Sequence, residues 1–403
     1  MRLLFIADGR SPIALNWAAH FVQVGHEVHW VSTYPCRIDL PLASLTIVPA
    51  AFGEIAGELG EPRQARKSQL LRRIVPVKVR TALRQWLGPL TLPRAVRRLR
   101  TVVASLQPDL VHAMRIPYEG MLVTQALPGR SETSRQPPVL RTPVLISVWG
   151  NDFTLHARAN PWMMRLTRRT LQRADALHTD CQRDQRLAGE WGFDRRKPAL
   201  VLPGNGGIHL DLFHPAEHPA EEPQNFTIIN PRGFRSYVCN EAFFRAIPTV
   251  LAHFPRARFT CPTMAGEAQA ERWVAELGIS ASVSLLPRQT RPQLADLFRQ
   301  AQVVVSPTTH DGTPNTLLEA MACGCFPVAG DIESLREWIT PGVNGLLTTP
   351  DDPHALAGAI VQALENPVLR ASAAVYNQRL VAEKAEYEQG MRRAEKFYQE
   401  LIS

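Results

Sequence analysis

The most constraining feature of the sequence is a repeated alternation between short apolar segments and amphipathic helices. In the first half, apolar segments predict strands at Leu3–Ala7 and Glu27–Ser32, with a helix at Leu15–Val24 between them. A strand, a glycine-containing loop, a helix and a second strand within about 30 residues form a βαβ unit, whose right-handed connection makes the strands parallel. Further strands are predicted at Leu45–Val48, Leu110–Ala113, Val144–Val148, Ala176–Thr179 and Ala199–Leu202.

A second series of the same kind fills the second half of the chain. The loop Pro203–Gly207 and a Pro-, Glu- and His-rich stretch up to Pro223 predict a linker between the two series. Strands are predicted at Thr227–Asn230, Arg258–Cys261, Val283–Leu285, Val303–Ser306, Phe326–Ala329 and Gly345–Leu347. We therefore expect an α/β fold of two Rossmann-like, doubly wound parallel-sheet domains facing across a cleft, with ligands at the carboxyl ends of the strands.

The length and composition are typical of a folded two-domain protein. The chain has 403 residues, 45% of them apolar and 20% charged, and is too long for one ordinary core. We expect an N-terminal domain over residues 1–212 and a C-terminal domain over residues 213–386, with a closing helix over residues 387–403 packing back on the N-terminal domain. The longest apolar runs are too short to cross a bilayer, and the scattered cysteines indicate buried small residues rather than metal ligands. A cytoplasmic protein is expected.

Residues 62–108 form a basic arm that contains no acidic residue, so the formal net charge of +8 is unevenly distributed. Arginines and lysines alternate there with leucine, valine, isoleucine and Trp86, which is typical of an amphipathic stretch on an anionic membrane surface. A solvated surface arm or a nucleic-acid contact could have the same composition. Of the three, we expect the membrane surface, and no nucleic acid as a partner.

The stretch His310–Gly324 carries the strongest signal for chemistry. It follows an apolar strand, and Gly312 and Pro314 shape a tight loop before a helix. Unsatisfied N–H groups at the start of that helix would point at an anion, and the helix dipole adds to the attraction, so a diphosphate fits there. Glu319, about one turn into the helix, can accept hydrogen bonds from ribose hydroxyls, and Asp311 can accept them from a sugar.

An ordinary helix start with a capping acid and a surface Glu would share this spacing, but the whole stretch is longer and more specific. Residues 311–328 read D-G-T-P-N-T-L-L-E-A-M-A-C-G-C-F-P-V. This stretch resembles the signature of the retaining glycosyltransferases of family 4, which have the GT-B fold. Asp331, Glu337 and the segment Gly342–Leu347 continue the resemblance, which covers the C-terminal half well and the N-terminal half weakly.

The resemblance implies a nucleotide-diphospho-sugar donor, linked to UDP or GDP and held by the C-terminal domain. Glu319 would bind the ribose. The other donor-binding residues would be those around the helix start: Gly312, Thr313, Pro314, Asn315, Thr316 and Leu317. Asp311 stands where the family usually has Glu, and its shorter side chain leaves the identity of the donor sugar open.

A second departure from the family follows the first strand of the donor domain, where an Arg and a Lys usually neutralise the diphosphate. Arg232 matches the Arg, whereas Tyr237 stands where the Lys would be. Arg235 is the nearest spare cation and could replace it with a bidentate guanidinium grip. For both arginines the alternative is an ordinary surface residue.

In the N-terminal half the resemblance places Asp152 near the donor sugar, with Trp149 where a His is common. Asp152 could instead cap the helix that follows it, and His156 is interpreted as an ordinary histidine rather than a catalytic one. Gly9, in the loop after the first strand, matches a Gly-rich loop that the family keeps near the donor. It could equally be a plain turn.

The resemblance implies transfer with retention at the anomeric carbon, by front-face attack in which a diphosphate oxygen takes the acceptor proton. Asp311, Asp152 and Arg232 would be the catalytic residues, with no metal and no cofactor. The acceptor would be a glycan or a lipid-linked molecule in cell-envelope polysaccharide or glycolipid assembly. Two alternatives stay open, a nucleotide-sugar epimerase of the same fold and a non-enzymatic binding protein.

Overall fold

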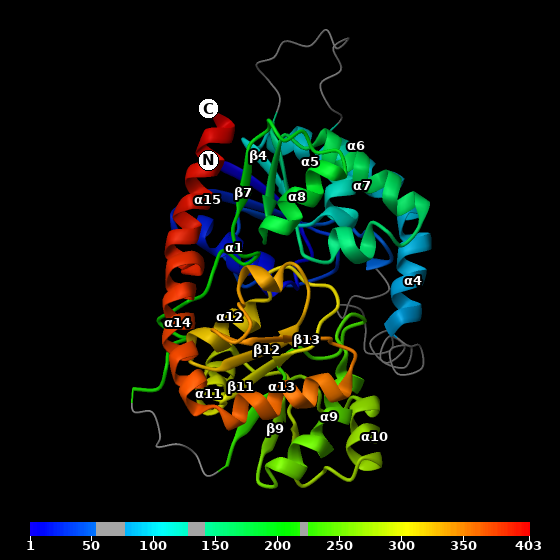
Figure 1. Cartoon of the computed structure of the whole chain (residues 1–403). Coiled ribbons are helices and arrows are strands. Elements are labelled where there is room, and N and C mark those ends of the chain that lie inside the picture. Colours follow the sequence, from blue (N-terminus) through cyan, green and yellow to red (C-terminus); the bar gives the residue numbers. More distant parts are fainter. Residues whose placement is uncertain (54–76, 128–141, 218–224) are drawn as a thin grey trace. The chain divides into compact units, whose positions relative to one another are not determined.

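The computed structural model describes residues 1–53, 77–127, 142–217 and 225–403. This part of the chain divides into two compact units, the first made of residues 1–206 and 389–403 and the second of residues 207–388 (Figure 1). Residues 62–76 of the basic arm lie outside the described residues. Within the described chain, no helix has the length and apolar composition needed to span a membrane.

The first unit is built on a seven-stranded parallel sheet with the strand order β3-β2-β1-β4-β5-β6-β7. The strands are β1 (Arg2–Ala7), β2 (Glu27–Ser32), β3 (Ser44–Ile47), β4 (Leu110–Ala113), β5 (Val144–Val148), β6 (Ala176–Thr179) and β7 (Ala199–Val201). The chain reverses its direction of growth between β1 and β4, which is the switch point where ligands bind in doubly wound sheets. The loops after β1, β2, β4 and β5 gather at that edge.

Helices cover this sheet, because both of its faces are apolar and must be buried. They are α1 (Pro12–Gln23), α4 (Val77–Leu87), α5 (Leu92–Leu106), α6 (Met121–Ala126), α7 (Pro161–Arg173), α8 (Gln182–Glu190) and α15 (Tyr387–Ile402), with the short turns η1 (Gly88–Thr91), η2 (Ile116–Gly120) and η4 (Asp152–His156). The first helix begins at Pro12, earlier than the apolar pattern predicts. Ser11 caps it by accepting a hydrogen bond from the Ala14 N–H, and proline suits the first helical position.

The second unit is built on a six-stranded parallel sheet with the order β10-β9-β8-β11-β12-β13. Its strands are β8 (Thr227–Ile229), β9 (Arg258–Cys261), β10 (Val283–Leu285), β11 (Val303–Ser306), β12 (Phe326–Gly330) and β13 (Leu346–Thr348). Its helices are α9 (Asn240–His253), α10 (Ala268–Glu276), α11 (Arg291–Gln300), α12 (Asn315–Ala322), α13 (Pro353–Glu365) and α14 (Pro367–Ala385), with the turn η5 (Leu335–Glu337). The predicted fold class, two Rossmann-like parallel-sheet domains, is confirmed.

The last helix, α15, belongs to the first unit although it is the end of the chain (Figure 1). Tyr398 lies fully buried on it and stacks on Phe21 of α1, with ring centroids 4.5 Å apart. Trp17 donates a hydrogen bond from its indole to the Tyr398 hydroxyl at 2.9 Å, and the same hydroxyl contacts His112 of β4. His112 is therefore a core residue that helps to attach α15.

Candidate functional site

The candidate donor site lies at the carboxyl edge of the second sheet, where two loops from neighbouring strands meet. β8 and β11 pair side by side, so the loop after β8 and the loop after β11 emerge next to each other. Thr309 donates from its N–H to the carbonyl of Tyr237 at 3.0 Å, and Cys239 donates to the carbonyl of Pro307 at 2.8 Å. Tyr237, which replaces the family's Lys, thus helps to join the two loops through its backbone.

Three of the sequence-predicted residues come together across these loops. The Arg232 guanidinium forms an ion pair with Asp311 and donates to the Thr316 hydroxyl at 3.1 Å. Both charged side chains are largely shielded, with 10% and 15% of their side-chain surface exposed, and Arg232 Nε is buried without a hydrogen-bond partner in the described chain. The site therefore holds a guanidinium at the start of α12, partly neutralised by Asp311.

The start of α12 offers two backbone donors beside this guanidinium. Pro314 precedes the helix in an extended conformation and its carbonyl takes the N–H of Leu317. The N–H groups of Asn315 and Thr316 donate no hydrogen bond to any residue that the structure describes. Unpaired donors at the positive end of a helix dipole are a suitable environment for a phosphate.

The loop before α12 is held in place by hydrogen bonds from outside it. The Ser334 hydroxyl donates to the Asp311 carbonyl at 2.7 Å, and the Trp338 indole donates to the Thr313 hydroxyl at 3.2 Å. The Asp311 carboxylate also accepts from the Gly312 N–H at 3.1 Å. This loop is consequently fixed by the chain around η5 before any ligand arrives.

Glu319 is buried, with 6% of its surface exposed. Burial raises its pKa from 4.5 to about 7, and Arg291 offsets part of that rise. Arg291 begins α11, and its Nη2 lies 3.8 Å from Glu319 Oε1. The sequence singled out Glu319 but gave no reason to connect it with Arg291, because the two are far apart in sequence and meet only when α11 and α12 pack.

Arg235 does not join this group. Its side chain is exposed and makes no hydrogen bond or ion pair with the described residues. The hypothesis that Arg235 takes over from the missing Lys therefore stays a prediction, since nothing positions its guanidinium in the absence of a ligand.

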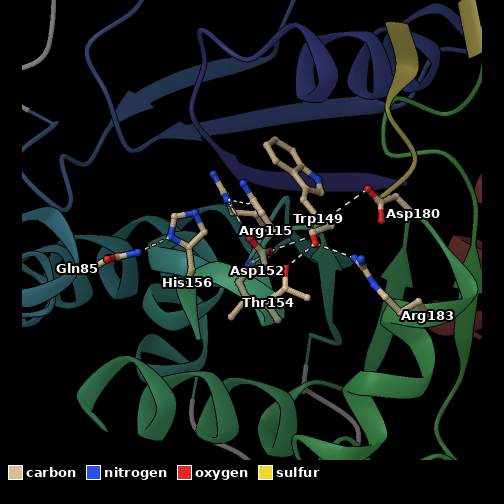
Figure 2. A network of polar contacts seen from close by, with 11 residues as sticks. Gln85, Arg115, Trp149, Asp152, Thr154, His156, Asp180 and Arg183 are labelled. Carbon is tan, nitrogen blue, oxygen red and sulfur yellow. Dashed lines mark hydrogen bonds and ion pairs between the residues drawn. The ribbon is translucent and has the colours of Figure 1, made fainter. Parts of the chain in front are cut away.

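In the first unit, Asp152 connects the loops after β4 and β5 (Figure 2). One carboxylate oxygen accepts from Arg115 Nη2 at 2.9 Å. The other accepts from the N–H groups of Ile116 and Trp149, both at 3.1 Å. Because the carboxylate is fully buried and its oxygens are occupied, this geometry gives Asp152 a supporting role, and its assignment as a catalytic or sugar-binding residue stays a prediction.

The loop of Trp149 and Gly150 is held from its other side by two charged residues that follow β6 (Figure 2). Arg183 donates to the Gly150 carbonyl at 2.7 Å, and Asp180 accepts from the Gly150 N–H at 3.3 Å. Arg183 also forms a buried ion pair with Asp184 at 2.8 Å. The sequence did not indicate Arg115, Asp180 or Arg183, although each lies within four residues of the carboxyl end of a strand.

Asp180, Cys181 and Asp184 form the one cluster with a metal-like arrangement of donors in the described part of the chain, with ligand atoms within 4.8 Å of one another. The Arg183 guanidinium already occupies the position of a cation beside Asp184, which makes the cluster a poor site for a second positive charge. The sequence-based expectation that no metal binds stays a prediction.

Gly9 lies in the loop after β1, at the same edge. Its N–H donates to the Ser32 hydroxyl at 3.0 Å, and a Cβ added there would come within 2.3 Å of the Cys36 sulfur. Close packing is thus a sufficient reason for glycine at this position, and its contact with a donor stays a prediction.

Comparisons with known proteins identify the family. A model described as "Glycosyl transferase 4-like domain" matches residues 9–204, and one described as "Glycosyl transferases group 1" matches residues 239–366. The chain belongs to the group 1 glycosyltransferases. The two matched segments lie in the first and the second unit, and together they span most of the chain.

Curated relatives and solved structures agree with this family. A D-inositol 3-phosphate glycosyltransferase of Thermobispora bispora is 28% identical over 42% of this chain and 44% of its own length, and one of Mycolicibacterium paratuberculosis is 31% identical over 44% and 42%. The matched region spans less than half of each relative. Sucrose-phosphate synthase from Thermosynechococcus elongatus (TM-score 0.74, 17% identity, 100% and 99% covered) and Anabaena HepE in complex with UDP (0.71, 14%, 99% and 100%) share the GT-B fold.

Proposed function

We propose that this protein is a glycosyltransferase that moves a sugar from a UDP- or GDP-linked donor to an acceptor. The observation that carries the proposal is the start of α12, where the unpaired N–H groups of Asn315 and Thr316 lie beside the Arg232 guanidinium. A diphosphate can take both N–H groups and share the guanidinium with Asp311. Glu319, further along the same helix, then receives the ribose hydroxyls.

UDP is the more favoured of the two nucleotides in this proposal. HepE, which shares the fold, has been solved with UDP and with UDP-glucose. The relatives carry the name D-inositol 3-phosphate glycosyltransferase, which states glycosyl transfer as their reaction. These likenesses support the reaction class, whereas Asp311 in place of Glu keeps the sugar itself open.

The proposed reaction proceeds with retention and without a metal. The bond between the anomeric carbon and the diphosphate oxygen breaks, the acceptor oxygen bonds to the same face of that carbon, and the leaving diphosphate takes the acceptor proton. Negative charge builds on the diphosphate as the bond breaks, and Arg232 with the α12 N–H groups would stabilise it. In this proposal the second unit binds the donor and the first unit binds the acceptor.

A cytoplasmic enzyme that contacts an anionic membrane completes the proposal. On the described end of the basic arm, large apolar side chains are exposed at Leu83, Trp86, Leu87 and Leu90. Arg94, Arg97 and Arg98 are exposed on the following helix. Exposed apolar side chains next to exposed cations favour an anionic lipid surface, where an acceptor of cell-envelope polysaccharide or glycolipid assembly would be carried.

A donor screen tests the central proposal. Purified full-length protein is titrated with UDP, GDP, UDP-sugars and GDP-sugars while its melting temperature is recorded, and products formed with candidate acceptors are analysed for anomeric configuration. Stabilisation by one nucleotide and a product with the donor's configuration are expected. A free epimerised sugar nucleotide would instead identify an epimerase, and no stabilisation by any nucleotide would refute the enzyme.

Sedimentation with vesicles tests the membrane contact separately. Binding to vesicles that contain anionic lipid is expected to fall when Trp86 and Leu90 are replaced by serine and to be weak for neutral vesicles. The matched control replaces the exposed Val375 of α14 by serine. Equal binding of the parent and the Trp86 and Leu90 variant to anionic vesicles, or binding of the parent to neutral vesicles as tight as to anionic ones, would contradict the proposed membrane role of the arm.

A further inference from the structure

The core of the first unit contains a network of hydrogen bonds that the candidate site does not use. It runs across three neighbouring strands, β4, β5 and β6, and joins them to α1 and α15. All of its members are buried. In order, they are Trp17, Tyr398, His112, Ser147, His178 and the carbonyl of Leu202. A buried polar network is costly unless every member is satisfied, so the position of each proton in it matters.

The two ends of the network fix the direction of every hydrogen bond within it. The Trp17 indole can only donate, and it lies 2.9 Å from the Tyr398 hydroxyl. The Leu202 carbonyl can only accept, and it lies 3.0 Å from His178 Nε2, which must therefore carry a proton. Each group between these ends has to accept from one neighbour and donate to the next.

Both histidines are consequently neutral and carry their proton on Nε2. His178 Nδ1 accepts from the Ser147 hydroxyl at 2.8 Å. Ser147 accepts from His112 Nε2 at 2.7 Å, and His112 Nδ1 accepts from the Tyr398 hydroxyl. The network thus places five protons in five hydrogen bonds. A sixth proton would leave one donor without an acceptor.

The surroundings of the two imidazoles also disfavour an added proton. Burial lowers the pKa of His112 well below 6.5, with a contribution from His178, and it lowers the pKa of His178 to about 4. Among the described residues, the titratable side chains that contact the two rings are the rings themselves, with centroids 6.4 Å apart, and Tyr398. Burial raises the pKa of Tyr398 well above 10. None of these groups is an anion that would balance a charged imidazole.

Helix α15 is the element that yields when a proton enters the network. His112, Ser147 and His178 lie on strands that are hydrogen-bonded to their neighbours in the sheet. Tyr398 is the member of the network on α15, and its ring stacks on Phe21 of α1. A proton on His112 Nδ1 would face the Tyr398 O–H, so the hydroxyl would lose its acceptor and the network would break at α15.

Glu395, one turn earlier on α15, makes a second polar contact with the first unit. Its carboxylate lies 3.4 Å from His20 Nε2 and 3.1 Å from His26 Nε2. A charged imidazole binds a carboxylate more strongly than a neutral one, so this contact strengthens in mild acid. It therefore cannot account for a loss of α15 as the pH falls. Where α15 begins, Tyr387 stacks on His209, with ring centroids 3.9 Å apart.

We infer that α15 is attached to the first unit by an acid-sensitive latch, which opens when His112 or His178 binds a proton. The inference does not depend on the proposed reaction, because the latch lies within the first unit (Figure 1). The chain passes between the units at residues 206–207 and 388–389. Since α15 follows the second passage, the latch determines whether that passage is anchored in the first unit.

The sign of the pH dependence follows from the two states of the helix. The docked state binds the proton less readily than the open state, in which the imidazole of His112 reaches water. Docking is therefore complete above about pH 6.5 and weakens as the pH falls. For one proton, the ratio of docked to open α15 should fall about tenfold for each unit of pH below that value.

Hydrogen exchange of the full chain, read by mass spectrometry between pH 8 and pH 5, tests the latch. Exchange in residues 389–403 is corrected for the intrinsic pH dependence of amide exchange, and β1 is the internal reference. Protection of residues 389–403 should fall more than about tenfold between pH 6.5 and pH 5, while β1 stays protected. His112→Gln should reduce this change to a few-fold at most. His253→Gln, which replaces an exposed histidine of α9, is the matched control and should behave as the parent does.

Three results would overturn the inference. They are protection of residues 389–403 that does not change with pH, a loss of protection that β1 shares equally, and a pH dependence in His112→Gln equal to that of the parent. If His112→Gln does not fold, Tyr398→Phe is used in its place, because it keeps the stacked ring and removes the hydroxyl. It should lower the protection of residues 389–403 at pH 8, and unchanged protection would show that the network does not hold α15.

Nitrogen NMR of the protein labelled with ¹⁵N-histidine reads the protons of the network directly. In the parent, two histidines should remain neutral and protonated on Nε2 at pH 5.5. Their signals are assigned by their loss in His112→Gln and in His178→Gln. A charged ring, or a proton on Nδ1, at either position would overturn the assignment of the network.

Discussion

Replacement of Glu319 by Gln is expected to stabilise the protein while it weakens nucleotide binding. Glu319 is buried beside an arginine that lies 3.8 Å away, too far for a strong hydrogen bond. Burial therefore raises the pKa of its carboxyl from 4.5 to about 7. The charged form of Glu319, buried without a close cation, therefore lowers the free energy of unfolding. Under the proposed function, binding of the ribose is the reason for a carboxylate at this position.

The magnitude follows from proton linkage. At about 1.4 kcal/mol for each pKa unit, the difference between 4.5 and about 7 corresponds to about 3 kcal/mol. Because the folded state holds the proton more tightly than the unfolded state, this cost is absent below pH 4.5, grows as the pH rises, and is complete above about pH 7. Glutamine has no charge to bury, so the variant should be more stable at pH 8 and little changed below pH 4.5.

Thermal unfolding of the parent and the variant at several pH values measures this difference. For a unit of this size about 3 kcal/mol corresponds to a rise of several degrees at pH 8. Glu271→Gln, which replaces an exposed glutamate of α10, is the matched control and should show no such gain. A Glu319→Gln variant that is destabilised equally at every pH would refute the reasoning, because it would mean that the charged form is already compensated.

Nucleotide binding should change in the opposite direction. Ribose hydroxyls donate to the charged carboxylate, and a hydrogen bond to a charged group contributes about 1.5–3 kcal/mol, which is about 10- to 150-fold in affinity. The ratio of UDP affinities, parent over variant, should therefore be large at pH 8 and fall below pH 7. The ratio cancels the titration of UDP itself. A ratio that stays constant with pH would refute the ribose assignment.

Three further substitutions test the other contacts. Asp152→Asn should destabilise the first unit by about 3–5 kcal/mol, because it removes the buried carboxylate that pairs with the Arg115 guanidinium. Urea unfolding measures this change. A loss of transfer activity at unchanged stability would instead support a direct role of Asp152 with the sugar. Tyr398→Phe should cost about 1–3 kcal/mol, since the buried Trp17 indole loses its acceptor, whereas Tyr376→Phe on the surface of α14 should cost nothing measurable in the same melts. Asp311→Asn should tighten the binding of UDP several-fold by calorimetry, because Asp311 competes with the diphosphate for Arg232, and weaker binding would mean that the pair is needed to orient Arg232.

The fold could be predicted from the sequence because it depends on local periodicity. Short apolar runs between amphipathic helices, such as Val303–Ser306, form buried strands. The connections between successive strands are long enough for a helical crossover, which makes the strands parallel. Helix α14 was not predicted, because its exposed Val368 and Val375 blur the apolar stripe. The short turn η5 is flanked by Ser334 and Trp338, whose side chains hold the donor loop through hydrogen bonds.

The candidate site could be predicted only where its residues are contiguous. The loop before α12 and Glu319 fall within a few turns of one segment, so their chemistry is visible in the sequence. Arg291 and Arg115 are brought to their partners by tertiary packing, and in a chain rich in arginine their residue type gives no indication of a role. Their position directly after a strand or at a helix start is the one indication that a sequence could have given.

The two units share one electrostatic arrangement. In each, an arginine at the carboxyl edge of a parallel sheet is oriented by a carboxylate from a neighbouring loop, Arg232 by Asp311 and Arg115 by Asp152. Orientation in advance lowers the entropy lost when a ligand binds, but the carboxylate also cancels charge. In the second unit, the N–H groups of Asn315 and Thr316 at the start of α12 donate to no carboxylate among the residues that the structure describes. Under the proposed function, these N–H groups favour a diphosphate over a neutral sugar at that edge, because an anion gains from them without displacing the pair of Arg232 and Asp311.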